Sequence, residues 1–309
     1  MRNIFASIVA FVIALGSVSA QDLAQVTEIY NTAAASISMD KAGALKSFEQ
    51  ALQLAEALGE EGQEIVTNCK NVIPDLTLSI GKDMAMDSNY DGAISQINAA
   101  IAVAEKYANA DIVTEAKNLL PQIIMQKATD LINTKKYVEA AAALKEVLGL
   151  EPTNGAAALR LGVALNATGD VAGATEAFLQ AAANGQEKTA HKQLSNLNLK
   201  QAAAALKTKS YADAVNAALE SVKYGENAQA YQIAAQASQL AGKNNDAIQY
   251  FEKYLEVSPN AKNAGQIAFT VGALYQQAKN NEKAKEFYSK ATSDPKYGAE
   301  AKKLLDALK

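Results

Sequence analysis

One spacing of side chains recurs along the chain and limits the folds that are open to it. A small residue is followed after twelve positions by alanine, after four more by a large apolar residue, and after another three by a mostly small residue. Gly162, Ala174, Phe178 and Ala181 form such a set. Apolar positions three and four residues apart lie on one face of a helix, so the pattern predicts helices and not strands.

The pattern occurs seven times in one phase. The other six sets are Thr32, Ala44, Phe48, Ala51; Gly81, Ala93, Ile97, Ala100; Ala128, Ala140, Leu144, Val147; Ala202, Ala214, Ala218, Ser221; Ala235, Ala247, Phe251, Tyr254; and Gly272, Ala284, Tyr288, Ala291. Turn-forming residues such as Gly169-Asp170 separate the first two members, so each set predicts a helix, a tight turn and a second helix. We expect Gly162 to face Ala174 within a pair, and Phe178 and Leu165 to fill the gap to the next pair.

This spacing resembles the tetratricopeptide repeat, whose period is about 34 residues. The best-matching stretches are Gly155–Lys188 and Pro121–Asn154, and Pro152 and Pro259 stand where the family has its inter-repeat turn. The resemblance implies an all-α protein, a right-handed α-solenoid of about seven helix-turn-helix repeats.

The repeats fall into two groups, lengthened ones in residues 21–120 and regular ones in residues 121–298. Residues 65–74 and 112–121 are identical at six of ten positions, which indicates a duplicated insert. Either a short helix precedes Pro74 and Pro121, or one long helix bends at each proline; the absence of other turn residues favours the long bent helix.

Two further features are expected in the regular part. Six extra residues, 189–194, adjoin a polar run at 184–188, which predicts a surface loop. Residues 299–309 predict a capping helix with Leu304, Leu305 and Leu308 turned inward and charged residues outward, as the end of a repeat stack requires.

Residues 1–20 have the pattern of a secretory signal peptide. Arg2 precedes a twelve-residue apolar run, and Val18-Ser19-Ala20 supplies a cleavage site before Gln21. Twelve residues are too few to cross a bilayer core of about 30 Å, so an uncleaved anchor is the weaker alternative and no stable membrane insertion is expected after cleavage. The protein is therefore predicted to be exported, to the periplasm of a Gram-negative cell and otherwise to the medium.

Residue types that carry chemistry are scarce. Cys69 and His191 are the single cysteine and the single histidine, which excludes an intramolecular disulfide and leaves too few ligands for zinc. We expect Cys69 to be packed in a helix and His191 to lie in an exposed loop. No phosphate-binding or dinucleotide-binding glycine motif is present. A net charge of −4 argues against a nucleic-acid partner. We therefore predict no enzyme, no cofactor and no metal.

Binding remains. In the tetratricopeptide family, side chains of the first helices line a concave groove that takes peptides or a partner's surface. Transferred by spacing, this implies as partner-binding residues Gln122, Met125, Thr129, Asn133, Leu159, Asn166, Gln229, Gln232, Gln236, Gln239, Gln266, Phe269, Gln276 and Gln277. The groove's lysines, Lys82 and Lys207, do not supply the paired lysine and asparagine with which some members hold a terminal carboxylate. The alternative is that the glutamines only solvate an exposed face.

Two classes of function remain open. The first is a non-catalytic interaction scaffold or adaptor of the bacterial cell envelope that binds a protein or peptide. The second is a glycan- or peptidoglycan-associated binding module, or an accessory subunit of an envelope enzyme, because neutral amides can also hydrogen-bond sugar hydroxyls.

Overall fold

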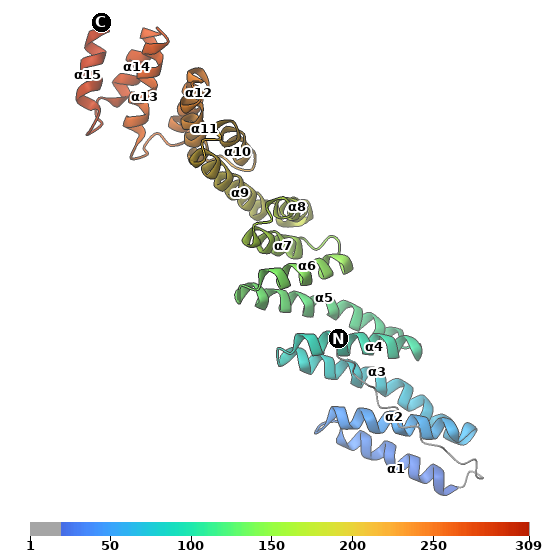
Figure 1. Ribbon diagram of the computed structural model, residues 1–309. Helices are drawn as coiled ribbons and strands as arrows, with labels where there is room; N and C mark the ends of the chain where they lie inside the picture. Colours follow the sequence, from blue (N-terminus) through green and yellow to red (C-terminus); the bar gives the residue numbers. More distant parts are fainter. Residues whose placement is uncertain (1–19, 309) are drawn as a thin grey trace. The chain divides into compact units, whose positions relative to one another are not determined.

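The computed structural model describes residues 20–308, so residues 1–19 of the predicted signal peptide lie outside the described residues. Of the described residues, 84% are helical and none lies in a strand, which confirms the all-α prediction. In that same range no helix combines the length and the apolar character needed to cross a lipid bilayer. Consecutive helices run back along one another (Figure 1).

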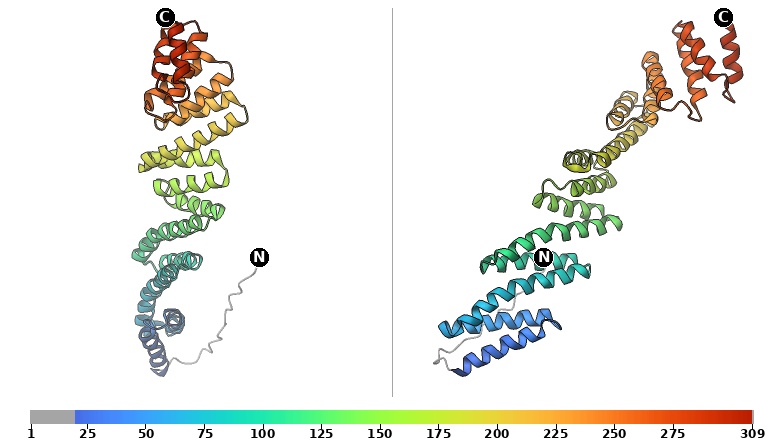
Figure 2. Two further views of the ribbon diagram at one scale, coloured as in Figure 1. Left: turned by 90° about the vertical axis from the view of Figure 1, so that its left-hand side faces the viewer. Right: turned by 180° about the vertical axis from the view of Figure 1, so that it is seen from behind.

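The chain divides into two compact units, residues 1–127 and 128–309. The helices of the first unit are α1 (Ala20–Ser36), α2 (Lys41–Ala57), a 3-10 turn (Gly59–Gly62), α3 (Gln63–Met86), α4 (Tyr90–Lys106) and the start of α5 (Ala110–Asn133). The second unit continues with α6 (Tyr137–Leu150), α7 (Gly155–Thr168), α8 (Val171–Ala181), α9 (Glu187–Lys207), α10 (Tyr211–Lys223), α11 (Ala228–Leu240), α12 (Asn244–Val257), α13 (Ala264–Gln277), α14 (Asn281–Ala291) and α15 (Gly298–Ala307). Two further views show the same alternation of helix and turn (Figure 2).

A recurring turn reverses the chain within a pair. After the first helix, one residue takes a left-handed backbone, for example Ser88 (φ 59°) or Gly169 (φ 85°). The N–H of Asn89 then donates to the carbonyl of Met84, five residues back, at 2.9 Å, and the Asn89 side chain accepts the N–H of Gly92 to cap the second helix. The same backbone hydrogen bond closes the turns at Lys136, Asp170, Ser210, Lys243 and Asn280.

The predicted contact positions are buried. The alanine in the first turn of each second helix is fully buried in all seven repeats, namely Ala44, Ala93, Ala140, Ala174, Ala214, Ala247 and Ala284. The large residue four positions later is also buried, as Phe178 (0% exposed) and Tyr288 (1%) show. The register predicted for the second helices is therefore confirmed.

The glycines of the first helices contact the large residue of their own repeat. A Cβ atom added to Gly162 would lie 2.5 Å from the Phe178 ring, and one added to Gly272 would lie 2.7 Å from the ring of Tyr288. Phe178 thus fills the space that Gly162 leaves inside the pair, and its predicted contact with the next pair stays a prediction. Overlap at these distances allows no side chain at either glycine without a shift.

The first repeat deviates by one residue. Thr32, the predicted small contact residue, is exposed, and Ala33 is buried instead. The reason lies in the turn: Asp40 donates its N–H to Ser36, four residues back, and not to a carbonyl five residues back. The turn therefore places the contact position of α1 one residue closer to the second helix.

The two duplicated prolines lie inside continuous helices. Pro74 is within α3 and Pro121 is within α5, each 24 residues long, as the favoured alternative predicts. The expectation for residues 184–194 was only partly right. The non-helical backbone is confined to Asn184 and Gly185, and the extra residues lengthen α9, because the chain re-enters a helix at Glu187.

The last two repeats and α15 share one apolar core. It includes Phe251, Val271 and Tyr288, and three half-buried leucines pack against it: Leu304 and Leu305 of α15, and Leu308 directly after the helix. Lys302 and Lys303 are exposed on the opposite side of α15. The predicted cap is thus present, with apolar residues inward and charges outward.

The contact between Gly162 and Phe178 generates the first prediction. Gly162→Ala should destabilise the protein by about 1–3 kcal/mol, because the added methyl overlaps the ring. Gly149→Ala in α6, where nothing lies within 4 Å of the added Cβ atom, is the matched control and should be neutral or slightly stabilising. Urea unfolding measures both variants; equal losses of stability would contradict the packing described here.

Candidate functional site

The described residues contain no group of three or more His, Cys, Asp or Glu side chains that could hold a metal ion. Cys69 is fully buried in α3, and burial raises the pKa of its thiol to about 11. A thiol with such a pKa is protonated at neutral pH and is a poor nucleophile. Packing is therefore the role that the structure gives Cys69, as the sequence predicts.

The prediction for His191 is wrong in its location. The residue lies in α9 and is half-buried, with its ring 5.5 Å from that of Tyr224, centroid to centroid. The loop was expected from the polar run before it, but helix α9 begins four residues earlier, at Glu187.

The predicted groove residues on α11 and α13 form two stripes of amide side chains. On α11, Gln229, Gln232, Gln236 and Gln239 follow at intervals of three and four residues and are all exposed or half-buried. On α13, Gln266, Phe269, Gln276 and Gln277 are likewise accessible. Residues at this spacing share one helix face. We call these eight residues the amide surface.

Internal contacts already engage part of the amide surface. Gln276 accepts a hydrogen bond from the Tyr288 hydroxyl at 2.7 Å, and Gln277 accepts one from Asn244 at 3.2 Å. Phe269 stacks on Tyr297 with ring centroids 5.1 Å apart. By contrast, no side-chain hydrogen bond within the described chain engages Gln232 or Gln236, so their amides are available to a partner.

The remaining predicted residues lie on α5 and α7. Gln122, Met125, Thr129 and Asn133 on α5, and Leu159 and Asn166 on α7, are all exposed or half-buried. The Gln122 amide donates to the carbonyl of Asn118 at 3.0 Å. Because α5 passes from one compact unit to the other, its residues are placed only on their own helix.

The groove lysines are not a carboxylate-binding pair. Lys82 forms an ion pair with Glu115, Nζ to Oε1 at 2.5 Å, within the first unit. Lys207 lies in the last turn of α9, on the second unit. Because Lys82 is paired with Glu115, its ammonium is not free to hold a terminal carboxylate, in agreement with the sequence analysis.

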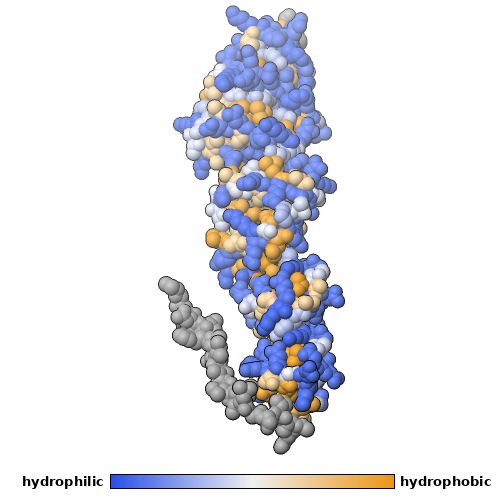
Figure 3. Space-filling view, turned by 90° about the vertical axis from the view of Figure 1, so that its right-hand side faces the viewer, coloured by the Kyte–Doolittle hydropathy of each residue, from blue (hydrophilic) through white to orange (hydrophobic). Residues whose placement is uncertain are grey.

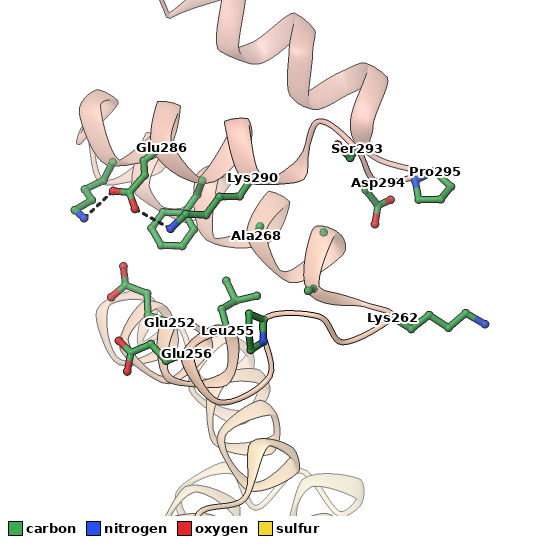
Figure 4. A pocket seen from close by; sticks show the side chains of 15 residues that line it. Glu252, Leu255, Glu256, Lys262, Ala268, Glu286, Lys290, Ser293, Asp294 and Pro295 are labelled. Carbon is green, nitrogen blue, oxygen red and sulfur yellow. Dashed lines mark hydrogen bonds and ion pairs between the residues drawn. The ribbon is translucent and has the colours of Figure 1, made fainter.

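A hollow that sequence reasoning missed lies between α12 and α14. This C-terminal cleft has a volume of about 690 Å³ and combines apolar residues with charged ones, namely Glu252, Leu255, Glu256, Pro259, Lys262, Ala264, Gly265, Ala268, Lys283, Glu286, Phe287, Lys290, Ser293, Asp294 and Pro295. Leu255 points from α12 toward α14 across the gap, with Ala268 of α13 behind it (Figure 4). The cleft thus lies mainly on second helices, whereas the amide surface lies on first helices.

Charges around the cleft are mostly paired within the protein. Lys283 and Lys290 both bond Glu286 at 2.8 Å, and these hydrogen bonds lower the pKa of that carboxyl. Glu252 accepts the Tyr275 hydroxyl at 2.8 Å; burial, and then this bond, raise the pKa of Tyr275 to about 12. Asp294 accepts the backbone N–H groups of Lys296 and Tyr297 at 2.9 Å and so holds the turn that precedes α15.

A sequence signal for the cleft exists in its two loops. The segments 258–265 and 293–298 each begin with serine, contain proline and lysine, and end in glycine at the next helix. From the sequence alone, the family resemblance indicates an inter-repeat turn at Pro259 in the first segment and none in the second segment. Because the α14–α15 connection repeats the same residue types, it indicates a second inter-repeat loop beside the first.

Residues 131–197 match the sequence profile of the tetratricopeptide repeat family. This segment includes α6, α7 and α8, and it covers most of both best-matching stretches. Among curated proteins, none matches the chain in sequence.

Several solved structures are similar to the chain. A MamA protein aligns over 59% of this chain and 96% of its own, with 18% identity and a TM-score of 0.36. YrrB, described as a tetratricopeptide repeat protein with an unusual peptide-binding site, aligns over 59% and 91%, with 20% identity and a TM-score of 0.33. PilF of Pseudomonas aeruginosa aligns over 62% and 84%, with 18% identity and a TM-score of 0.32.

The burial of Cys69 predicts a pH effect. Because the pKa of the thiol is raised from 9.0 to about 11, the unfolded chain loses this proton between about pH 9 and 11 while the folded chain keeps it. The contribution of the protonated thiol to stability is thus full below pH 9 and is lost as the pH rises through this window. Urea unfolding of the wild type and of Cys69→Ala at pH 8, 9.5 and 10.5 measures it. The stability difference between the two should shrink with pH; parallel curves would contradict the assignment.

Proposed function

We propose that the protein is an exported, non-catalytic scaffold that binds a partner protein or peptide through the amide surface. The observation that carries this proposal is the pair Gln232 and Gln236: accessible amides on one face of α11 without an internal hydrogen bond. Each amide can donate and accept, which suits the N–H and C=O groups of an extended peptide. A non-catalytic role agrees with the buried, protonated Cys69 and with the general use of tetratricopeptide repeats as interaction modules.

Aromatic side chains lie beside part of the amide surface. Phe269 and Tyr297 form a stacked aromatic pair beside Gln266, so apolar contacts accompany the polar ones. On the face shown in Figure 3, hydrophobic side chains form separate patches among hydrophilic ones. Such mixed surfaces are typical of interfaces between proteins that also exist apart.

Export is the part of the proposal that the sequence pattern of residues 1–20 supports. N-terminal sequencing of the protein purified from its native cells should give Gln21 as the first residue, because cleavage is expected after Ala20. Replacing Val12 by Arg in the apolar run should leave the precursor uncleaved inside the cell. A wild-type chain that retains Met1 would contradict export by this route.

The binding proposal is tested with a pair of matched variants. Gln232→Ala with Gln236→Ala should weaken crosslinking of the partner in the exported fraction at least tenfold, since two hydrogen-bonding amides are removed. Asn245→Ala with Gln249→Ala removes two exposed amides at the same spacing from α12 and should leave crosslinking unchanged. Equal crosslinking by both variants would place the site elsewhere, and binding of isolated glycan strands by the wild type would favour the glycan-associated alternative.

A further inference from the structure

The C-terminal cleft has apolar side chains in its floor, and the ammonium of Lys290 lies 4.3 Å from the centre of the Phe287 ring at one side of it. Leu255 of α12 points into it, and Ala268 and Phe287 line it from α13 and α14. Pro259 and Pro295, one from each of the two inter-repeat loops, also line it. A hollow of about 690 Å³ with such a lining accommodates several residues of an extended peptide.

The loop end of the cleft continues into a second hollow of about 510 Å³. The two hollows share Lys262, Asp294 and Pro295, and the second one adds Lys296 and the amide of Gln266. A single extended segment can therefore contact both hollows. Figure 4 shows Lys262 at this end, directed away from the gap between α12 and α14.

The charges at this end are not balanced. The carboxylates of Glu252, Glu286 and Asp294 each accept hydrogen bonds inside the protein. Lys262 and Lys296, in contrast, have no acidic partner within the described chain; the ammonium of Lys296 lies 5.1 Å from the centre of the Tyr297 ring. An incoming carboxylate can thus pair with two lysines that have no ion-pair partner among the described residues, while the single negative charge of Asp294 remains beside them.

We propose that the C-terminal cleft binds an extended peptide segment of a partner, with apolar side chains between α12 and α14 and acidic side chains beside Lys262 and Lys296. This site borders the amide surface at Gln266 but does not include Gln232 or Gln236, because most of its lining lies on the second helices of the last two repeats and on their loops. The proposal adds a second interaction surface to the scaffold and states the chemistry of its partner.

Two blocked peptides test the acidic preference. Acetyl-Leu-Phe-Ala-Glu-Glu-amide and its Gln-Gln counterpart carry the same apolar part and differ only in charge. Titrations of the purified full chain, followed in ¹H–¹⁵N TROSY spectra, give the Kd and the residues whose signals shift. The acidic peptide should bind about tenfold more tightly, since each exposed ion pair contributes a factor of up to about five, and the shifts should lie on α12, α14 and the two loops.

Matched variants separate the charges from the fold. Lys262→Gln with Lys296→Gln should abolish the preference for the acidic peptide, while Lys192→Gln with Lys302→Gln, which removes two exposed lysines elsewhere in the same unit, should preserve it. Leu255→Ser should weaken both peptides, with a melting curve that shows whether the variant is folded. Gln232→Ala with Gln236→Ala should leave peptide binding unchanged. The peptide titration therefore tests the cleft separately from the proposed function, which rests on Gln232 and Gln236.

Three results would overturn the proposal. The first is equal affinity for the two peptides, and the second is an undiminished preference in the Lys262 and Lys296 variant. The third is self-association of the wild type that Leu255→Ser abolishes, because the cleft would then be occupied by a second copy of this chain.

Discussion

The close contact between a glycine of one helix and a large side chain of the next determines what this protein can do. Where a Cβ atom would lie 2.5 Å from the Phe178 ring, as at Gly162, the two helices meet without space between them for a ligand. Gly272 with Tyr288 and Gly81 with Ile97 repeat the arrangement. Each pair is thus filled by its own side chains, and binding is left to the outer faces of the helices and to the spaces between pairs.

The fifth repeat shows how far this packing tolerates a polar residue. Ser221 takes the fourth position of the pattern and is fully buried, but its hydroxyl donates to the carbonyl of Ser195 at 2.8 Å and lies 3.0 Å from the Ser195 hydroxyl. Burying a hydroxyl that keeps its hydrogen bonds costs little free energy of folding, whereas burying one that loses them is strongly destabilising. At this position the size of the side chain therefore matters more than its polarity, provided that a polar side chain makes its hydrogen bonds within the same helix pair.

The sequence predicted what depends on local spacing and missed what depends on the arrangement of loops. Helix pairs, turns and buried alanines follow from residues close in the chain, and the continuous helices through Pro74 and Pro121 follow from the lack of other turn residues. The prediction that Thr32 is the contact residue is wrong because one backbone hydrogen bond, from the N–H of Asp40 to the carbonyl of Ser36, shortens the turn after α1. The prediction of an exposed loop at His191 is wrong because only two residues before α9 leave the helical conformation. The accessibility of the amide residues was predictable, but the C-terminal cleft forms from loops about 35 residues apart, beyond the reach of a helical periodicity.

The repeat beside the cleft departs from the pattern at its fourth position. Tyr254 stands at the fourth position, where Ala51, Ala181 and Ala291 have only a methyl group. It is 5% exposed, and its hydroxyl donates to the side chain of Asn263 at 2.5 Å, which ties the end of α12 to the start of α13. A ring needs more room than a methyl group between one pair and the next. Glu252, Leu255 and Glu256, which flank Tyr254 on α12, line the cleft, whereas Tyr254 itself belongs to the buried core and not to the lining.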